Sequence, residues 1–491
     1  MFKKSFATIC VLLVGSWSAS GQSGAQGKET ALQKAAAVLG ARDLKSIQYS
    51  GSGYNFAVGQ NVNPRAAWPK FNVKSYARVI NYETVSSREE LVRTQFENPP
   101  RGGGAQPIIG EQRQVLLVSG PHAWNLSGTT ATPAPAAAGE RLTQIWLTPH
   151  GFLKAAEANK ATVRVRTLGG RKVHAVSFTG HGKFKVSGII NDQGLVERVE
   201  TRIANPVLGD MLVETLYSEY QDFGGIKFPT RIVQKQGGFP ALDLTITTVQ
   251  QNSVADIQTP DNVRQAAAPT VRVESQKLAD GVWYLTGGSH HSAAIEFKDH
   301  VAVIEGPQTE ERSLAVIAEV KRLAPGKPIK YLVNTHHHFD HSGGIRTYAA
   351  EGATIITHQI NRAFYERASR APRTLSPDKL SQTKHPLAIA TFTDKQVLTD
   401  GARVVELHHI KGSTHNDGII MAYLPKEKLL IEADVYTPAA PNAPPPATPN
   451  TFTVNLHENI QRLKLEVDQI APLHGRLVTM GDLLKSIGKG Q

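Results

Sequence analysis

Residues 335–341 read Thr-His-His-His-Phe-Asp-His, and five of these side chains are able to bind a metal ion. The apolar run 329–333 precedes them and Ser-Gly-Gly follows, which predicts a buried strand that ends in a ligand-bearing loop. Open parallel sheets place their binding sites at the carboxyl ends of strands. If the chain runs extended from Thr335, then His336, His338 and Asp340 alternate onto one side. Buried imidazoles and carboxylates need partners, which favours a metal site over a polar loop with chance histidines.

The spacing His-x-His-x-Asp-His resembles the signature of the metallo-β-lactamase superfamily, and three later landmarks follow in the order typical of that family. His415 precedes the strand that closes with Leu424-Pro425. Asp434 ends the apolar segment 429–433, and His474-Gly475 follows the segment 467–472. The resemblance covers about residues 272–491 and implies a four-layered αββα sandwich there.

The resemblance also implies two metal sites. His336, His338 and His415 would bind one ion, Asp340, His341 and His474 would bind the second, and Asp434 would bridge them. Two zinc ions suit this nitrogen-rich set, and iron or manganese is not excluded. Such a pair lowers the pKa of a shared water, and Asp340 would orient the resulting hydroxide and carry its proton.

Tyr436 lies two residues beyond Asp434, and tyrosines of lactonase-like relatives donate to a developing oxyanion from a similar place. We therefore predict a catalytic role for Tyr436, with packing against the Pro-rich segment 438–449 as the alternative. That segment forms either a semi-rigid wall at the rim of the site or an insertion that points into solvent.

Four further histidines have weaker claims on the metal site. His290 and His291 form either a solvated turn or a substrate contact, because the early hairpin loop of this fold overhangs the site. His408 and His409 lie in the apparent strand 404–410 and are expected to pack there instead of binding metal.

The first residues predict a secretory signal peptide at 1–25, with Lys3 and Lys4 before an apolar core at 6–14 and small residues after it. The apolar core is too short to span a bilayer, which needs about 20 residues. The protein is therefore expected in the periplasm or outside the cell. Removal of Cys10, the single cysteine, would leave no disulfide and no thiolate ligand.

The chain carries a formal charge of +12, which loss of Lys3 and Lys4 lowers by two. Basic residues are scattered instead of forming a dense run, so nucleic acid is not the expected partner. We expect a small-molecule substrate and no stable membrane insertion, and a homodimer stays open.

A chain of 491 residues exceeds one core, so a second domain is predicted at 28–256, with a linker at 257–271. A helix at 29–39 precedes alternating segments at 47–54, 114–118, 174–178, 183–190, 195–202 and 242–249. These predict an α+β domain whose antiparallel sheet curves around itself or a helix. It would bind an apolar ligand, deliver substrate, or act as a scaffold that dimerises the enzyme. Segments 98–107 and 130–139 are predicted mobile loops.

In the C-terminal domain a helix is predicted at 310–323, with Leu314, Ile317, Ala318 and Leu323 on its buried stripe. The leading functional hypothesis is an exported dinuclear zinc hydrolase acting on an ester, lactone, thioester or amide. Glyoxalase-II-like and lactonase-like hydrolases carry an Asp where Asp434 stands, and true metallo-β-lactamases lack this bridge. A β-lactamase and a non-catalytic, metal-stabilised binding protein are the alternatives.

Overall fold

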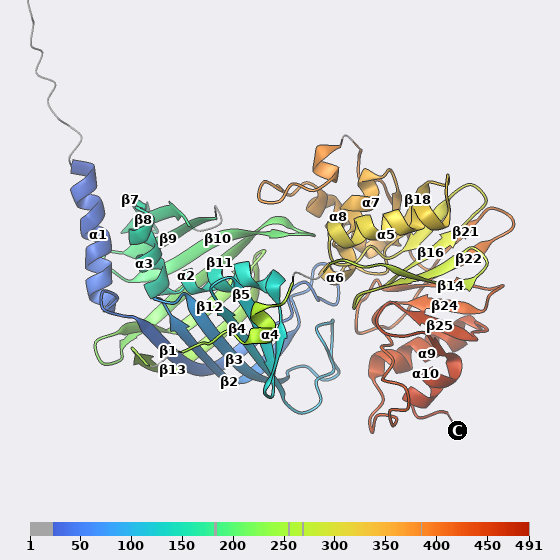
Figure 1. Ribbon diagram of the computed structural model, residues 1–491, viewed down its shortest axis with the longest axis horizontal. Coiled ribbons are helices and arrows are strands. Elements are labelled where there is room, and N and C mark those ends of the chain that lie inside the picture. Colours follow the sequence, from blue (N-terminus) through green and yellow to red (C-terminus); the bar gives the residue numbers. More distant parts are fainter. Residues whose placement is uncertain (1–22, 181–183, 254–255, 268–269, 384, 491) are drawn as a thin grey trace, which may run out of the picture.

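The computed structural model describes residues 23–180, 184–253, 256–267, 270–383 and 385–490. Residues 1–22 of the predicted signal peptide, Cys10 included, lie outside the described residues. The described chain forms an N-terminal and a C-terminal domain that lie side by side along the long axis (Figure 1). No helix of the described residues combines the length and the apolar character that crossing a membrane requires.

The N-terminal domain comprises α1 (Ser23–Leu39), β1 (Ser46–Phe56), β2 (Lys70–Asn81), β3 (Ser86–Gln95), β4 (Gln112–Ser119), β5 (His122–Ser127), β6 (Thr130–Pro133), η1 (Pro135–Ala137), α2 (Ala138–Trp146), α3 (Pro149–Ala158), β7 (Thr162–Leu168), β8 (Arg171–Thr179), β9 (Lys185–Asn191), β10 (Val196–Asn205), β11 (Gly209–Asp222), β12 (Lys227–Gln236), β13 (Phe239–Gln251) and α4 (Asp261–Arg264).

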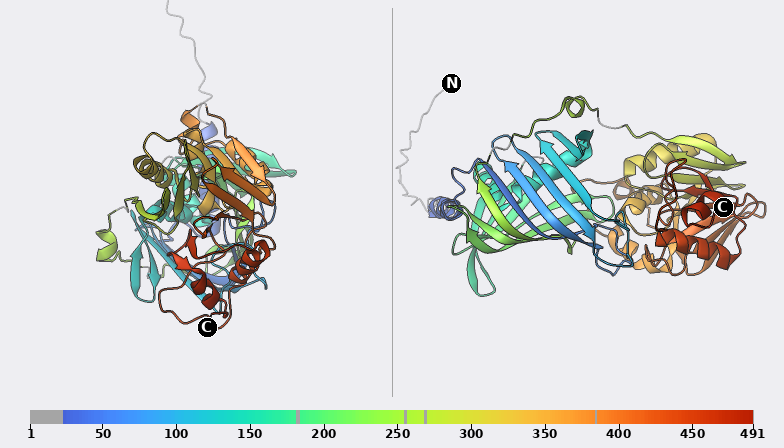
Figure 2. Two further views of the ribbon diagram at one scale, coloured as in Figure 1. Left: turned by 90° about the vertical axis from the view of Figure 1, so that its right-hand side faces the viewer. Right: turned by 90° about the horizontal axis from the view of Figure 1, so that it is seen from below.

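The strands form one sheet of 13 strands in the order β6-β5-β4-β3-β2-β1-β13-β12-β11-β10-β9-β8-β7. Every neighbouring pair in this sheet is antiparallel, including β1 with β13. The sheet curves strongly, as the view from below shows (Figure 2). Leu39, Ile145 and Phe152 of α1, α2 and α3 are fully buried in its core. The predicted α+β domain with an antiparallel sheet is confirmed.

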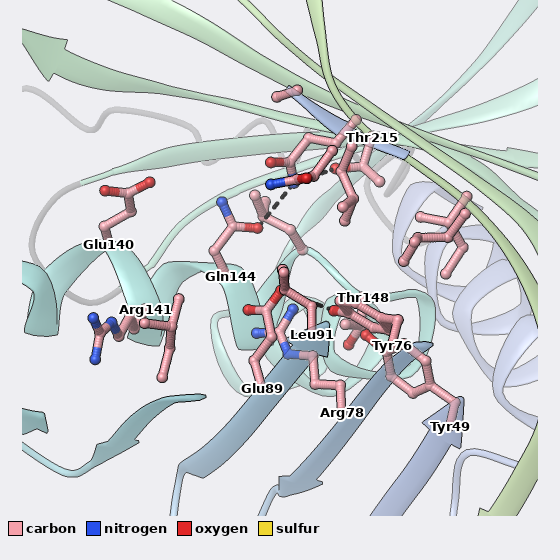
Figure 3. A pocket seen from close by; sticks show the side chains of 18 of the residues that line it. Tyr49, Tyr76, Arg78, Glu89, Leu91, Glu140, Arg141, Gln144, Thr148 and Thr215 are labelled. Atoms are coloured by element: carbon pink, nitrogen blue, oxygen red, sulfur yellow. Dashed lines mark hydrogen bonds between the residues drawn. The ribbon is translucent and has the colours of Figure 1, made fainter. Parts of the chain in front are cut away.

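The concave side of this sheet also encloses a cavity of about 340 Å³ (Figure 3). Polar side chains line it together with apolar ones: Tyr76 Oη donates to Glu89 Oε1 over 3.0 Å, and Arg78 Nε donates to Ser87 Oγ over 3.2 Å. The charged side chains of Arg78 and Glu89 distinguish this cavity from a purely apolar ligand pocket.

Two segments differ from their predicted form. Segment 130–139 is no open loop, because it contains β6, η1 and the start of α2. The predicted linker 257–271 contains the short helix α4, whose Val263 is buried against Val115, Leu117 and Trp124. Both segments bury apolar side chains that their Ala and Pro content obscured.

The C-terminal domain comprises β14 (Glu274–Ala279), β15 (Val282–Thr286), β16 (Ser292–Glu296), β17 (Val301–Ile304), α5 (Glu310–Leu323), β18 (Ile329–Val333), α6 (Phe339–Ser342), α7 (Ile345–Ala350), β19 (Thr354–His358), η3 (Gln359–Asn361), α8 (Arg362–Ser369), η4 (Leu380–Gln382), β20 (Ile389–Phe392), β21 (Lys395–Thr399), β22 (Val404–His409), β23 (Ile420–Leu424), β24 (Leu429–Glu432), α9 (Thr451–Leu463), β25 (Gln469–Pro472), β26 (Val478–Thr479) and α10 (Met480–Ser486).

These elements form a four-layered αββα sandwich, as predicted. One sheet runs β14-β15-β16-β17-β18-β19-β20 and the other β21-β22-β23-β24-β25-β26. Apolar side chains of both sheets pack together, among them Ile304, Val333 and Ile431. Helices α5 and α7 cover the outer face of the first sheet, and α9 and α10 cover that of the second. Strands β17 to β20 run parallel, so their carboxyl ends meet at one edge.

Helix α5 has the predicted bounds because its sequence carries both end signals. Thr309 accepts a hydrogen bond from the Arg312 backbone N–H, and acidic residues occupy the first turn with basic residues in the last. Its buried face differs from the predicted stripe, since Val316, Ile317 and Val320 are buried while Leu314 is 38% exposed. The helix is rotated relative to the expectation because Ser313 and Arg312, which are polar, also face inward.

Candidate metal centre

The His-rich loop begins where the buried strand β18 ends at Val333, at the carboxyl edge of the parallel strands. Asn334 organises it: its Nδ2 donates to the backbone oxygens of His336 (2.8 Å) and His341 (3.1 Å) and to Glu305 Oε1 (3.0 Å). One buried amide therefore fixes both ends of the loop. The following turn is helical, since Phe339–Ser342 forms α6.

The first group of candidate ligands contains His336, His338, His415 and Asp434. His336 Nε2 lies 2.9 Å from His338 Nδ1, and His415 Nε2 lies 3.2 Å from Asp434 Oδ2. The three imidazoles are buried. The loop after β18, the turn before β23 and the turn after β24 thus deliver their side chains to one point.

The second group contains His290, Asp340, His341 and His474. His341 Nε2 lies 3.0 Å from His474 Nε2. Asp434 also faces this group, because its Oδ1 is 2.7 Å from His341 Nε2 and 2.9 Å from His474 Nε2. The two oxygens of Asp434 are therefore directed at different groups, Oδ2 at the first and Oδ1 at the second.

The charge states of these side chains are compatible with cation binding. Burial lowers the pKa of His338 to about 3 and holds the pKa of His336 well below its usual value, so both imidazoles are neutral. Burial alone would raise the pKa of Asp434, but His341 and His474 outweigh it and hold this pKa well below its usual value. Neutral His336 and His338 beside an ionised carboxylate are the forms that bind a metal. His341 differs: burial alone would lower its pKa, but Asp434 and Asp340 outweigh burial and raise this pKa well above its usual value, so metal binding there would release a proton.

Unpaired polar atoms test whether a metal fits here. Both ring nitrogens of buried His415, and Oδ1 of Asp434, make no hydrogen bond of acceptable geometry with any residue that the structure describes. Buried polar atoms rarely stay without a partner. In each group the facing ligand atoms lie within 4.8 Å of one another, and every donor is imidazole nitrogen or carboxylate oxygen. This donor set suits zinc, and iron or manganese as well.

A family model for the metallo-beta-lactamase superfamily matches residues 285–458. That stretch contains six of the seven predicted ligands, all but His474. The C-terminal domain belongs to the metallo-β-lactamase superfamily. The αββα layers and the His-x-His-x-Asp-His loop agree with this assignment.

Individual relatives are distant. A protein named 2,4-dinitroanisole O-demethylase subunit alpha, from Nocardioides sp. (strain JS1661), is 26% identical over 158 residues, which are 31% of this chain and 43% of that protein. The chain thus spans less than half the length of this curated relative. Among solved structures, a metallo-beta-lactamase from Pontibacter korlensis is 18% identical with a TM-score of 0.35, covering 44% of this chain and 98% of that one. The DIM-1 metallo-beta-lactamase is 15% identical with a TM-score of 0.34, covering 44% and 95%.

Glu305 is a buried carboxylate of this metallo-β-lactamase fold that the sequence analysis missed. It follows β17 and is fully buried, with Oε2 at 3.1 Å from His341 Nδ1 and in contact with the Thr335 hydroxyl. A carboxylate behind a ligating imidazole fixes its orientation and raises its basicity. The signal was present, since Glu305 ends the apolar strand that neighbours β18.

Three histidines beside the predicted ligands have different surroundings. His290 is no solvated turn residue: its Nε2 lies 3.2 Å from Asp340 Oδ2 and its ring centroid 4.1 Å from that of His474. His291 Nε2 lies 2.9 Å from the Gly475 oxygen. His408 Nε2 is 2.8 Å from Glu406 Oε2, outside both groups, as expected for a strand residue.

The structure contradicts the catalytic role predicted for Tyr436. Its side chain is 4% exposed and packs in the core between the second sheet, α9 and α10. Burial raises the pKa of Tyr436, and the Ser486 side chain of α10 interacts with its hydroxyl. Thr437, not Tyr436, lines the pocket beside the candidate metal ligands. The prediction was wrong because the side chain two residues beyond Asp434 points away from the pocket, towards the helices that cover the second sheet.

The N-terminal domain reaches into this centre through the loop that follows β1. Gln60 Nε2 donates to Asp340 Oδ1 over 2.8 Å, and the Asn61 backbone oxygen lies 2.9 Å from His338 Nε2. Asn61 Oδ1 also lies 3.1 Å from Nε2 of buried His337. Two candidate ligands are therefore oriented by residues nearly 280 positions earlier in the chain.

The loop 98–107, predicted to be mobile, also packs at this centre. The Gly102 backbone N–H donates to the Thr414 oxygen over 2.8 Å, next to His415. Gly103 and Gln106 line a cavity of about 550 Å³ whose opposite side includes Asp340, His415 and Asp434. Both domains thus form the walls of one pocket over the candidate metal ligands. The root of the Pro-rich segment touches its rim, where Pro438 lies against Gly475.

Proposed function

We propose that the chain is an exported, dinuclear zinc-dependent hydrolase that cleaves an ester, lactone, thioester or amide bond. One observation carries the proposal: two groups of metal-capable side chains share the floor of one pocket, with a carboxylate oxygen of Asp434 directed at each. When bound, two such ions lower the pKa of a shared water and polarise the carbonyl oxygen of a substrate.

Asp340 is placed to position the nucleophile and to accept its proton. Its Oδ1 accepts the hydrogen bond from Gln60, and its Oδ2 faces His290 Nε2 at 3.2 Å. Burial alone would raise its pKa, but His341 and His290 outweigh burial and hold the pKa of Asp340 well below its usual value. Asp340 is consequently a carboxylate at neutral pH, held from two sides and open to the pocket. It can orient a water and carry a proton to the leaving atom.

Fold alone does not fix the substrate, so competing chemistries belong in one assay. A β-lactam is one competitor, because the solved neighbours are metallo-beta-lactamases. An aryl methyl ether is another, because the curated relative is named an O-demethylase subunit. The carboxylate directed at both ligand groups favours the ester, lactone, thioester and amide class, since β-lactamases of the superfamily lack this bridge.

The test is a hydrolysis panel of lactones, thioesters, carboxylic esters, amides, phosphodiesters, β-lactams and 2,4-dinitroanisole, run on protein purified with zinc. We expect turnover of a member of the first four classes, abolished by His415→Ala. The matched control is His408→Ala, which removes an equally buried imidazole outside both ligand groups. Turnover confined to β-lactams or to the ether, or equal activity in the two variants, would contradict the proposal. Export is tested separately by mass spectrometry, which should find a mature chain beginning between about Ser20 and Gln26.

A further inference from the structure

The N-terminal wall of the pocket contains a cation. Arg93 near the end of β3 lines the cavity that also exposes Asp340, His474 and Asp434, and it is 7% exposed. Gln60 and Gln106 are its polar companions on this wall. The wall therefore combines one guanidinium with neutral amides, opposite a floor of carboxylates and imidazoles.

Arg93 has no counter-ion within the described part of the chain. Its Nε donates to Gln112 Oε1 over 2.7 Å, and its guanidinium carbon lies 4.2 Å from the centroid of the Phe71 ring. No carboxylate oxygen of the described residues comes within 4.0 Å of its nitrogens, whereas buried Arg373 lies 3.3 Å from Asp378. Gln112 and Phe71 thus hold the guanidinium plane in place, and its two terminal nitrogens make no hydrogen bond to another described residue.

A buried arginine of this kind is costly unless a partner arrives. Removing a charge from water without pairing it is unfavourable. Burial lowers the pKa of Arg93 to about 10, and because this value is still well above 7, Arg93 carries its positive charge at neutral pH. Arg312 is satisfied in another way. Its guanidinium donates to the backbone oxygens of Arg272, Leu285 and Thr286, and the residue does not line this pocket. Arg93 has no such backbone carbonyl partner among the described residues, and it lines the pocket.

We propose that Arg93 binds an anionic group of the substrate, and that the substrates are carboxylate-bearing esters, lactones, thioesters or amides. The planar fork of a guanidinium matches the two oxygens of a carboxylate. The scissile bond would lie over the metal ligands while the carboxylate contacts the wall of the other domain. This substrate class rests on the proposed hydrolase function, but the anion site itself is measurable without turnover.

The test is isothermal titration of the zinc-loaded full-length protein with glutarate and, in parallel, with its uncharged dimethyl ester. We expect glutarate to bind the wild type more tightly than the diester. Arg93→Met should weaken glutarate binding about tenfold to hundredfold, the usual range for a lost hydrogen bond to a charged group. Arg93→Lys keeps the positive charge but loses the planar guanidinium, so its affinity for glutarate should lie between those of the wild type and Arg93→Met. Arg113→Met is the control, because this arginine lies on the neighbouring strand β4, is 57% exposed and pairs with Glu90.

Metal content and melting temperature of each variant separate a lost contact from a lost fold. Equal glutarate affinity in wild type and Arg93→Met, or no glutarate binding by the wild type, overturns the anion site. Should Arg93→Met fail to fold, Arg93→Lys decides: unchanged glutarate affinity overturns the proposal and weakened affinity supports it. Arg93-dependent binding without turnover of any panel substrate would contradict the hydrolase and leave the anion site standing.

Discussion

The two walls of the pocket are built differently. The C-terminal wall gathers metal-capable side chains from several loops around the His-rich loop, which Glu305 and Asn334 hold from behind. The N-terminal wall combines the polar side chains of Gln60, Arg93 and Gln106 with the small residues Ala57 and 103–105, none of which is a candidate metal ligand. Under the proposed function, the C-terminal domain would supply the reactive centre, while the N-terminal domain contacts two of its candidate ligands and forms the opposite wall of the pocket.

The largest expected effect tests the reactive wall. Asp340→Asn keeps the size of the side chain but removes the charge and the proton acceptor, so turnover should fall about 10²–10⁴-fold. The free energy of unfolding should change far less. Asp394→Asn is the control, because Asp394 is an exposed carboxylate paired with Lys411. Comparable turnover in Asp340→Asn and wild type, on any accepted substrate, would exclude Asp340 from the mechanism.

The next variant tests whether the walls depend on each other. Gly59 has φ +73°, and a Cβ there would lie 2.3 Å from the Phe339 ring, so in Gly59→Ala either Phe339 or the loop after β1 must shift. Gly110 has φ +71° with open space around its Cβ position, so Gly110→Ala carries the backbone strain alone. We expect Gly59→Ala to cost about 1–3 kcal/mol more than Gly110→Ala and to lower turnover as Gln60 shifts. If Gly59→Ala and Gly110→Ala had equal free energies of unfolding and equal turnover, the contact between Gly59 and Phe339 would be unimportant.

A third test uses the pH dependence of stability to examine a second contact between the domains, the one made by Arg373. Arg373 donates to the backbone oxygens of Asn205, Pro206 and Val207 in the β10–β11 turn, and it is anchored by Asp378. Burial alone would raise the pKa of Asp378, but Arg346 and Ser381 outweigh it and lower this pKa to about 2.

Because the folded pKa lies below the unfolded value of about 3.9, Asp378 stabilises the fold above pH 4, and this contribution is lost as pH falls towards 2. Asp378→Asn should therefore lower the free energy of unfolding by about 1–2 kcal/mol at pH 7, after allowance for partial exposure, with the difference vanishing near pH 2. Denaturant titrations at several pH values measure it. A difference that stays constant with pH would mean that the charge of Asp378 is not responsible.

The smallest effect is expected at Tyr436. Because its hydroxyl lies by α10 instead of the pocket, Tyr436→Phe should leave turnover within about twofold of wild type, in contrast to the 10²–10³-fold loss of an oxyanion donor. Steady-state kinetics on any accepted substrate measures this. A loss of a hundredfold or more would restore the oxyanion role.

The same difference between the walls explains what could be predicted from sequence. Candidate ligands of the C-terminal wall lie within a few positions of buried strands, so residue type and strand ends were enough to single out His336 and Asp434, which the structure brings into one group. The N-terminal wall carries no local pattern: Asn61 and Arg93 approach the centre only because β1 and β3 end at the domain interface. Contacts over nearly 280 residues depend on tertiary packing, which periodicity does not report. The same limit explains Tyr436, whose direction depends on how the chain leaves β24.

Elemental analysis of the mature protein after exhaustive dialysis tests the metal centre most directly. We predict about two divalent transition-metal ions per chain in the wild type and a clear loss in Asp434→Ala, since Asp434 faces both ligand groups. His408→Ala should retain the full complement, because His408 lies outside both groups. Absence of bound transition metal from the wild type, or an unchanged complement in Asp434→Ala, would contradict the account.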